Sequence, residues 1–248
     1  RTVRCSHLFA ADGLHSQIRR KAGLAGHRPP RYRRWGARCY FNSREVRNEV
    51  EVTLGDGVES YLTPLGEGRY GLAFLWSPKL LPESTSRGER IVERLLDRFP
   101  PDFLARLPAF EGDFWEGTRA VGPLHQRVLS PLHKSGRIAL AGDAAGYLDA
   151  LTGEGLCLGL RQARALSYCF CTGRLSDYPC EHRRIKARHR LVVGGLLWLI
   201  HHPLLRHRVF HALSTAGVLY GTVMNIDDKD PTKDQDKDQT DWRLVISL

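Results

Sequence analysis

The sequence predicts a mixed fold of the α+β or α/β class, in which an antiparallel sheet interrupts a domain that ends in helices. Three observations predict it. Residues 35–76 alternate strand-like runs with glycine-rich turns, which is typical of antiparallel strands. One apolar run before this region and one after it each end at a turn containing aspartate and glycine. From Gly155 onward the apolar residues follow helical spacing.

The first expected element is a strand over residues 2–11, which ends at Asp12-Gly13. Ser16 is placed to cap a short helix, because a serine side chain can accept a hydrogen bond from a free amide of the first turn. Gly23 is placed to close that helix. The chain is therefore expected to begin as strand, turn and helix.

Strands and turns dominate the next part of the chain. The strings "GDG" and "GEG" separate apolar runs and favour hairpins. After the sheet, apolar residues at helical spacing predict a helix that Pro100-Pro101 ends. The expected strands are 35–41, 49–55, 58–65, 69–76, 114–124 and 137–142, and the expected helix is 86–99.

Helical spacing then continues from Gly155 to the region after Pro203. A second helix is expected over 176–190 and a third, apolar one up to Ile200, and Pro203 breaks or starts a fourth. The apolar residues of the first helix lie on one face, which consists of Leu156, Leu160, Ala163, Ser167 and Phe170.

Composition argues against several function classes. The formal net charge is +10, but the arginines are scattered and no zinc-finger, RRM or KH pattern occurs, so no nucleic-acid partner is expected. The six cysteines show neither metal-site nor disulfide spacing, which predicts reduced thiols in a cytoplasmic protein without a metal. The longest apolar run, 191–200, has 10 residues, whereas a membrane span needs about 20.

The turn after the strand at 137–142 carries the most specific pattern, "GDAAGYLDALTGEGL". Asp143 follows a buried strand, where α/β sheets present ligand-binding groups, and a carboxylate there can accept hydrogen bonds from sugar or ribityl hydroxyls. The glycines of "TGEG" begin a helix whose free amides attract an anion or an electron-rich carbonyl. The alternative is an ordinary turn in which Glu154 complements the helix dipole.

The earlier turn has the pattern Asp-Gly-x-x-Ser-x-x-Arg from Asp12 to Arg19. Arg19 can pair with Asp12 or reach a phosphate. The alternative is a capped turn with a surface ion pair.

In this order, the two motifs resemble the Asp-Gly and Gly-Asp fingerprints of flavin-dependent oxidoreductases built like para-hydroxybenzoate hydroxylase. That superfamily includes class A monooxygenases, flavin-dependent halogenases and geranylgeranyl reductases. The resemblance covers roughly residues 2–213 and places the substrate domain in the antiparallel sheet between the motifs. It therefore implies the C-terminal part of an FAD fold with C-terminal helices.

The resemblance also implies roles for individual residues. Asp143 would hold the ribityl chain of FAD, and the amides of the second glycine turn would face the pyrimidine edge of the flavin. The first motif would support the pyrophosphate and the use of NAD(P)H. The implied cofactor-binding residues are Asp12, Gly13, Arg19, Gly142, Asp143, Ala144, Ala145, Gly153, Glu154, Gly155 and Leu156.

Two features depart from the family pattern. Ala150 stands where many members carry a proline. No Gly-x-Gly-x-x-Gly loop is expected anywhere in the 248 residues, so the N-terminal Rossmann βαβ unit for the ADP moiety is expected to be absent from this chain. The five expected parts are an FAD-domain segment at 1–27, a substrate domain at 28–119, a second FAD-domain segment at 120–173, a helical region at 174–224 and a disordered polar tail at 225–248.

The function implied is that of an FAD-dependent oxidoreductase, an NAD(P)H-using monooxygenase acting on an apolar or aromatic small molecule. Two alternatives stay open: a flavin saturase like the geranylgeranyl reductases, in peripheral contact with a membrane through the C-terminal helices, and an inactive fragment unable to bind FAD alone. No catalytic residue can be assigned. The sheet aromatics that can line a substrate pocket, or simply form the core, are Tyr61, Tyr70, Phe74 and Trp76.

Overall fold

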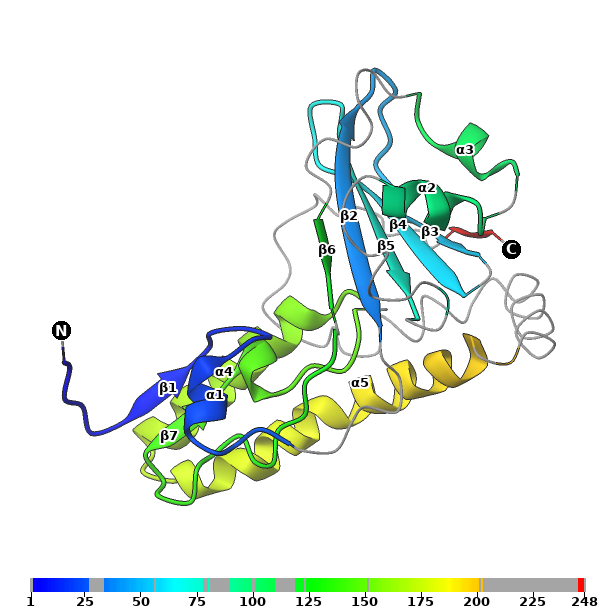
Figure 1. Ribbon diagram of the computed structural model, residues 1–248. Helices are drawn as coiled ribbons and strands as arrows, with labels where there is room; N and C mark the ends of the chain where they lie inside the picture. The colour runs from blue at the N-terminus through cyan, green and yellow to red at the C-terminus, as the bar shows by residue number, and fades with distance from the viewer. Residues whose placement is uncertain are drawn as a thin grey trace. The chain divides into compact units, whose positions relative to one another are not determined.

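The computed structural model describes residues 2–26, 34–55, 57–77, 80, 90–99, 101–109, 119–122, 124–150, 152–200, 202 and 245–247 (Figure 1). The chain divides into two compact units. Unit 1 comprises residues 1–34 and 122–198, and unit 2 comprises residues 35–121 and 199–248.

Unit 1 is built around two short parallel strands, β1 (Leu8–Ala10) and β7 (Ile138–Leu140). They pair in register, with Leu8 opposite Ile138 and Ala10 opposite Leu140. Because parallel strands end at the same edge, the turns after β1 and β7 are brought side by side. The strand expected over 2–11 is shorter than predicted, since residues 2–7 form no strand.

The helix after β1 forms as expected. α1 spans Gln17–Lys21, and the Ser16 hydroxyl accepts a hydrogen bond from the Arg19 amide at 3.0 Å. Gly23 follows the helix with φ +67°, a conformation that favours glycine. The predicted cap and stop of this helix are confirmed.

The turn after β7 begins with a short 3₁₀ helix, η2 (Gly142–Ala145), and continues into the long helix α4 (Gly155–Cys171). α4 buries Gln162, Leu166 and Cys169, and the last two pack with Ala139 of β7. The apolar face recognised in the sequence points the other way: Leu156 is 84% and Leu160 71% exposed.

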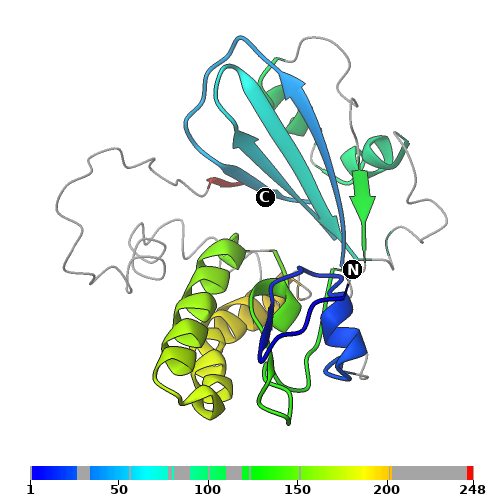
Figure 2. The same cartoon turned by 90° about the vertical axis from the view of Figure 1, so that its left-hand side faces the viewer.

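The chain then passes through η3 (Leu175–Asp177) into α5 (Tyr178–Ile200). The two helices expected over 176–190 and up to Ile200 are a single helix, so this prediction was wrong. Val193 and Leu197 continue the buried face past Gly194-Gly195, which keeps the helix in place across the two glycines. Figure 2 shows the two long helices of unit 1 in yellow-green and yellow.

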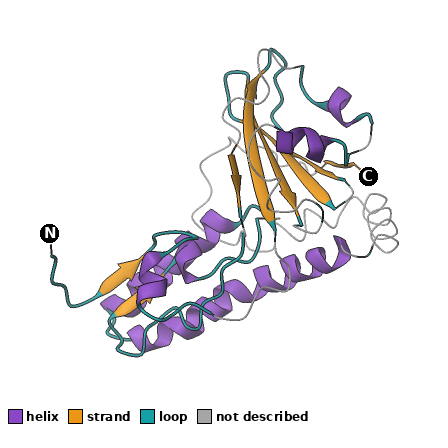
Figure 3. Ribbon diagram, in the orientation of Figure 1, coloured by secondary structure: helices purple, strands orange, loops and turns teal. Residues whose placement is uncertain are grey.

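Unit 2 contains a six-stranded sheet in the order β6-β2-β5-β4-β3-β8 (Figure 3). All neighbours are antiparallel except β3 and β8. The strands are β2 (Trp35–Asn42), β3 (Glu51–Leu54), β4 (Val58–Pro64), β5 (Arg69–Trp76), β6 (Arg119–Val121) and β8 (Val245–Ser247). The predicted antiparallel sheet is confirmed.

Helices α2 (Arg90–Leu96) and α3 (Phe103–Arg106) contribute to the core of unit 2. Ile91, Val92 and Leu95 of α2 pack with sheet residues such as Leu72 and form its buried cluster. α3 is an element that the sequence reasoning missed. The core of unit 2 therefore lies between α2, α3 and the sheet.

The β4–β5 hairpin contains the string Gly66-Glu67-Gly68-Arg69-Tyr70-Gly71, which has Gly-x-Gly-x-x-Gly spacing. The Arg69 amide donates to the Gly66 carbonyl, and Gly66 and Gly68 take positive φ values of 87° and 71°. A hairpin turn explains these glycines, because strand β5 follows them directly, whereas the glycines of a dinucleotide loop lead into a helix. They form no dinucleotide loop.

The end of the chain departs from expectation in one respect. Within the tail expected to be disordered, Val245–Ser247 form β8 and pair in parallel with β3. Several predictions fall outside the described residues: the helix start at 86–89, the strand start at 114–118, the helix after Pro203 and the tail at 225–244.

Candidate functional site

Asp12, at the carboxyl end of β1, caps α1. Its Oδ2 accepts hydrogen bonds from the Gln17 amide at 2.9 Å and the Ile18 amide at 3.2 Å. Burial alone would raise the pKa of Asp12, but its hydrogen bonds, including one with Ser16, outweigh burial and lower the pKa. Asp12 therefore orders the turn rather than presenting a free carboxylate.

Arg19 joins the two turns. Its side chain is buried, and its Nη1 donates to the backbone carbonyls of Asp143 at 3.1 Å and Ala144 at 2.9 Å. Its Nη2 donates to the Leu14 carbonyl at 2.6 Å. The surface ion pair considered as an alternative is wrong, because the guanidinium is buried against backbone carbonyls.

The contacts of Arg19 orient the peptide units of η2. The C=O and N–H of one planar peptide unit point in opposite directions. Since the carbonyls of Asp143 and Ala144 point at Arg19, the amides of Ala144 and Ala145 point away from it. Aligned backbone amides of this kind make a concavity that favours anions.

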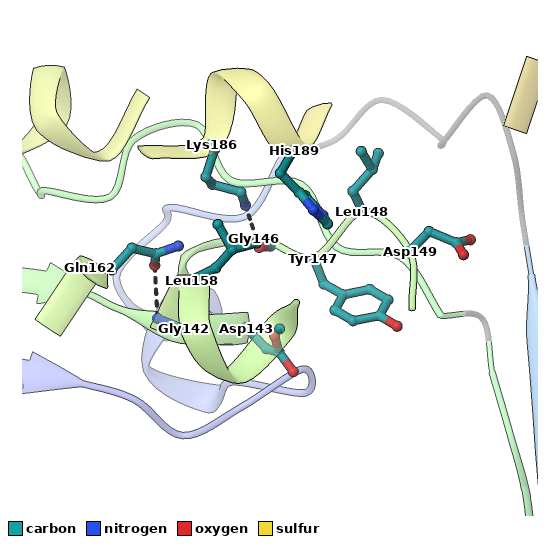
Figure 4. Close-up of a pocket in the computed structure, with 11 residues that line it drawn as sticks. Gly142, Asp143, Gly146, Tyr147, Leu148, Asp149, Leu158, Gln162, Lys186 and His189 are labelled. Atoms are coloured by element: carbon teal, nitrogen blue, oxygen red, sulfur yellow. Dashed lines mark hydrogen bonds between the residues drawn. The ribbon is translucent and has the colours of Figure 1, made fainter. Parts of the chain in front are cut away.

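A pocket lies over the turn that follows β7 (Figure 4). The Gly142 amide donates to Gln162 Oε1 at 2.9 Å, which ties the loop to α4. From α5, Lys186 Nζ donates to the Gly146 carbonyl at 2.5 Å. The lining residues are Gly142, Asp143, Gly146, Tyr147, Leu148, Asp149, Gly155, Leu158, Gln162, Lys186 and His189.

Asp143 contributes the carboxylate nearest the start of this loop. Burial raises the pKa of Asp143, and the positive charges of Lys186 and Arg19 oppose that rise. The two cations therefore favour the ionised form, which only accepts hydrogen bonds. Such a carboxylate suits a ligand that carries hydroxyl groups.

The N-terminus of α4 forms a second part of the pocket. Gly155 lines the pocket, and Gly153 precedes it with φ +68°. A Cβ atom added at Gly153 or Gly155 would meet no atom within 4 Å, so the approach to the first amides of α4 is open. The Glu154 carboxylate instead contacts His189 Nδ1 at 3.0 Å, and Leu156 is exposed.

The structure thus brings together only some of the predicted site residues. Gly142, Asp143 and Gly155 line the pocket, whereas Ala144 and Ala145 are buried beside it. Asp12, Gly13, Arg19, Gly153, Glu154 and Leu156 are not among the lining residues.

The four aromatic residues proposed for substrate contact belong to unit 2. Tyr70, Phe74 and Trp76 lie in its buried cluster. The Tyr70 hydroxyl donates to the Glu45 carbonyl at 2.8 Å, and half-buried Tyr61 donates to Glu59 Oε2 at 3.1 Å. Their surroundings are those of core side chains.

Sequence reasoning missed the contribution of α5 and of residues after the Gly-Asp turn. Lys186, His189, Tyr147 and Asp149 line the pocket without having been singled out. Asp149 is buried and paired with Arg34 at 3.8 Å. The i, i+3 spacing of Lys186 and His189 was the available signal, but the charged string around them also suits a solvated helix face.

Comparison with known proteins identifies the family. Residues 1–171 match the FAD binding domain family model, which is more than half of the chain. The chain belongs to this FAD-binding family. The FAD-binding chain is 27% identical over 165 residues to aurachin C monooxygenase/isomerase of Stigmatella aurantiaca, covering 65% of this chain and 42% of that protein.

A second relative is 3-demethoxyubiquinol 3-hydroxylase of Escherichia coli K12, 26% identical over 165 residues, covering 66% of this chain and 40% of that protein. The FAD-binding chain thus spans about two fifths of the length of these relatives. Among solved structures, Klebsiella pneumoniae HpxO complexed with FAD and uric acid matches with a TM-score of 0.59 at 21% identity, over 84% of this chain and 55% of that one. This last likeness shows the shared fold.

The residues of unit 1 fit the flavin side of FAD. The pocket presents a carboxylate, Asp143, for ribityl hydroxyls and an open helix N-terminus for an electron-rich edge. The amides of Ala144 and Ala145 point away from Arg19, an orientation that suits an anion. None of the described helices has both the length and the apolar character needed to cross a membrane. Among the described residues, no group of three or more metal-ligating side chains is placed to hold a metal ion.

Proposed function

We propose that this chain forms the flavin side of an FAD-dependent monooxygenase site that is reduced by NAD(P)H and acts on an apolar or aromatic small molecule. The observation that carries the proposal is the pocket in which Asp143, Gly142 and the N-terminus of α4 meet. When bound, FAD supplies the redox chemistry, and the protein supplies position and electrostatics.

Three groups of this chain have separate tasks in the proposal. The Asp143 carboxylate accepts hydrogen bonds from ribityl hydroxyls, and the amides of Ala144 and Ala145 face the pyrophosphate. The first amides of α4 face the pyrimidine edge of the flavin, where preorganised donors stabilise negative charge. Arg19 keeps the first two groups in place through the Asp143 and Ala144 carbonyls.

Hydroxylation is preferred to double-bond reduction because both curated relatives are named for oxygen insertion, one as a monooxygenase and one as a hydroxylase. The Trp-x-Trp-x-Ile-Pro signature of flavin-dependent halogenases does not occur in the sequence, which argues against halogenation. The saturase alternative predicts reduction of a prenyl double bond without oxygen uptake, so oxygen consumption separates the two activities.

Replacing Asp143 with alanine should weaken flavin binding by about 10- to 150-fold, because a hydrogen bond to a charged group contributes about 1.5–3 kcal/mol. Quenching of flavin fluorescence during titration with FAD measures the dissociation constant. Asp177→Ala, which removes an exposed carboxylate of the same unit, is the matched control and should bind like the original chain.

A titration with FMN, which lacks the adenylate part of FAD, tests which half of the cofactor is held. The proposal expects FMN to bind this chain within about 10-fold of FAD, one tenfold step being about 1.4 kcal/mol. Failure of both flavins to bind the original chain would contradict the proposal and support the alternative of an inactive fragment. Equal binding by Asp143→Ala would remove the role given to this carboxylate.

We also propose that the protein is cytoplasmic and that it contacts a membrane surface peripherally through α5. On this helix Leu191 is 78% and Trp198 43% exposed, and amphipathic tryptophan favours the membrane interface. Sedimentation with anionic phospholipid vesicles should therefore retain the original chain. Leu191→Ser combined with Trp198→Ser should reduce retention by at least about 10-fold. The reason is that burial of apolar surface in the membrane contributes about 25 cal/mol per Å², and the double variant removes two large apolar side chains. Equal retention of both proteins would contradict the contact.

A further inference from the structure

Helix α5 presents four polar side chains in one row. Tyr178, His182, Lys186 and His189 follow each other at intervals of four, four and three residues, so they lie on the same face of the helix. Tyr178, His182 and His189 are buried although the helix is rich in charge. A row of buried polar groups needs partners, and its partners here lie along the candidate site.

Each member of the row contacts a successive part of the site. The Tyr178 hydroxyl donates to the Leu140 carbonyl at 2.7 Å, at the end of β7. The buried His182 ring lies beside the Ala145 backbone of η2, and its Nε2 has no hydrogen-bond partner among the described residues. Lys186 Nζ donates to the Gly146 carbonyl at 2.5 Å, and His189 Nδ1 lies 3.0 Å from Glu154 Oε2 at the start of α4.

We propose that this row of α5 positions the flavin loop, which we define as residues 142–150 and 152–155, and that the Lys186 ammonium is the charge-dependent member of the row. These contacts are formed within the chain itself, so the positioning of the loop does not depend on the function proposed above. The consequence for flavin binding rests on the function proposed above. Figure 4 shows Lys186 reaching Gly146 and Gln162 reaching Gly142, so helices α5 and α4 each hold one point of the loop.

The backbone at Gly146 is adapted to this contact. Gly146 has φ +104°, a region that side chains rarely adopt. A Cβ atom there would lie 3.3 Å from the Gln126 carbonyl oxygen and 3.4 Å from Lys186 Nζ. The absence of a side chain at Gly146 therefore lets the loop backbone approach Lys186 closely enough for the hydrogen bond.

Charge makes Lys186 different from the other members of the row. Among the described residues it forms no ion pair with a carboxylate, and its hydrogen bond goes to a backbone carbonyl. Burial and, to a lesser extent, the charge of Arg190 lower the pKa of Lys186 to about 8, although Asp143 opposes both. Lys186 therefore loses its charge as pH rises through about 8.

The other groups facing Lys186 do not share this titration. Burial, together with the charge of Lys186, lowers the pKa of His125 and of His182 to about 4, so both rings are neutral above pH 6. Asp143 is a carboxyl group whose charged form Lys186 favours. A loss of loop order near pH 8 thus reports on Lys186.

Hydrogen exchange of the full chain without flavin, measured by mass spectrometry, tests the proposal. Lys186→Met should lower the protection factors of peptides covering residues 142–147 by about 10-fold at pH 7, the ratio that corresponds to loss of one charge-assisted hydrogen bond. Lys186→Gln keeps a hydrogen-bond donor without the charge, so its protection factors should lie between those of the original chain and those of Lys186→Met. Arg184→Met removes an exposed cation of the same helix and should leave protection unchanged.

The pH profile separates positioning from a merely structural role. Protection of these peptides in the original chain should fall between pH 7 and pH 9, whereas Lys186→Gln should show no such fall. If Lys186→Met fails to fold, the comparison of Lys186→Gln with the original chain decides the result. Unchanged protection in Lys186→Met, or the same pH profile in Lys186→Gln, would overturn the proposal.

An FAD titration of the same variants separates this inference from the proposed function. If the original chain binds no FAD, the proposed function fails while the exchange result still decides the positioning role. If the original chain binds FAD, Lys186→Met should weaken binding by about 10-fold, again by loss of one such hydrogen bond. Equal affinity of the two proteins would overturn the link between the α5 row and the flavin.

Discussion

Replacing Arg19 with methionine is expected to destabilise unit 1 by about 3–5 kcal/mol. Arg19 is 2% exposed and donates to the carbonyls of Leu14, Asp143 and Ala144. Methionine fills a similar volume but donates no hydrogen bond, so the carbonyls of Leu14 and Ala144 lose the Arg19 donor and that of Asp143 keeps only the Gly146 amide. Each buried group left unsatisfied costs about 1–3 kcal/mol, which sets the expected range.

Hydrogen exchange at increasing urea concentration measures this effect unit by unit, because peptides from residues 122–198 and 35–121 report separately. Arg19→Met should lower the urea midpoint of unit 1 and leave unit 2 unchanged. Arg20→Met removes a neighbouring exposed arginine and should change neither midpoint. Arg19→Lys should recover part of the lost stability, because a lysine ammonium can still donate hydrogen bonds but lacks the planar arrangement of donors in the guanidinium. A midpoint unchanged in Arg19→Met would contradict the bridging role.

The two turns of the site could be predicted from the sequence because their signals are local. Asp143 and Gly142 follow an apolar strand, and Ser16 stands where a short helix needs a cap, so each signal spans only a few residues. The order of the two turns then identified the family. The sheet was predicted for the same reason, since glycine-rich turns mark its hairpins.

The partner of Arg19 could not be predicted in this way. The sequence offered Asp12 or a phosphate, both suggested by the local motif. All three actual acceptors are backbone carbonyls, which exist at every position and leave no trace in the residue types, and two of them lie 124 and 125 residues further along the chain. Only the parallel pairing of β1 with β7 brings them together.

The long helices show the same limit. An apolar stripe ordinarily marks the face of a helix that meets the core, yet α4 exposes Leu156 and Leu160 and buries Gln162. Gln162 is buried because its Oε1 accepts from the Gly142 amide. On α5, Lys186 and His189 look like part of a solvated face until the loop that they contact is in place. Polar side chains that hold a site are therefore hard to distinguish from surface residues by spacing alone.

Replacing Phe74 with alanine should destabilise unit 2 by about 3–5 kcal/mol, the cost of emptying a large buried aromatic site. Phe74 is fully buried on β5, whose two neighbours in the sheet are β2 and β4. Its ring centroid lies 6.0 Å from that of Phe99, which follows α2. The substitution removes contacts to both the sheet and the helical layer.

The alternative role of Phe74, contact with a substrate, predicts a different pattern. Phe74→Leu keeps the site apolar and largely filled, so it should cost less than about 1.5 kcal/mol if Phe74 is core. Tyr61→Ala, at a half-buried position of the neighbouring strand, is the companion variant. Urea midpoints of unit 2 give the stability, and kcat/KM for an aromatic substrate gives the activity.

If Phe74 is a core residue, Phe74→Ala lowers the stability of unit 2 but retains kcat/KM per folded molecule. If kcat/KM instead falls at least tenfold in Phe74→Leu while the urea midpoint is unchanged, Phe74 lies in the substrate pocket. A tenfold fall corresponds to about 1.4 kcal/mol of lost transition-state binding, and the unchanged midpoint shows that packing is not lost.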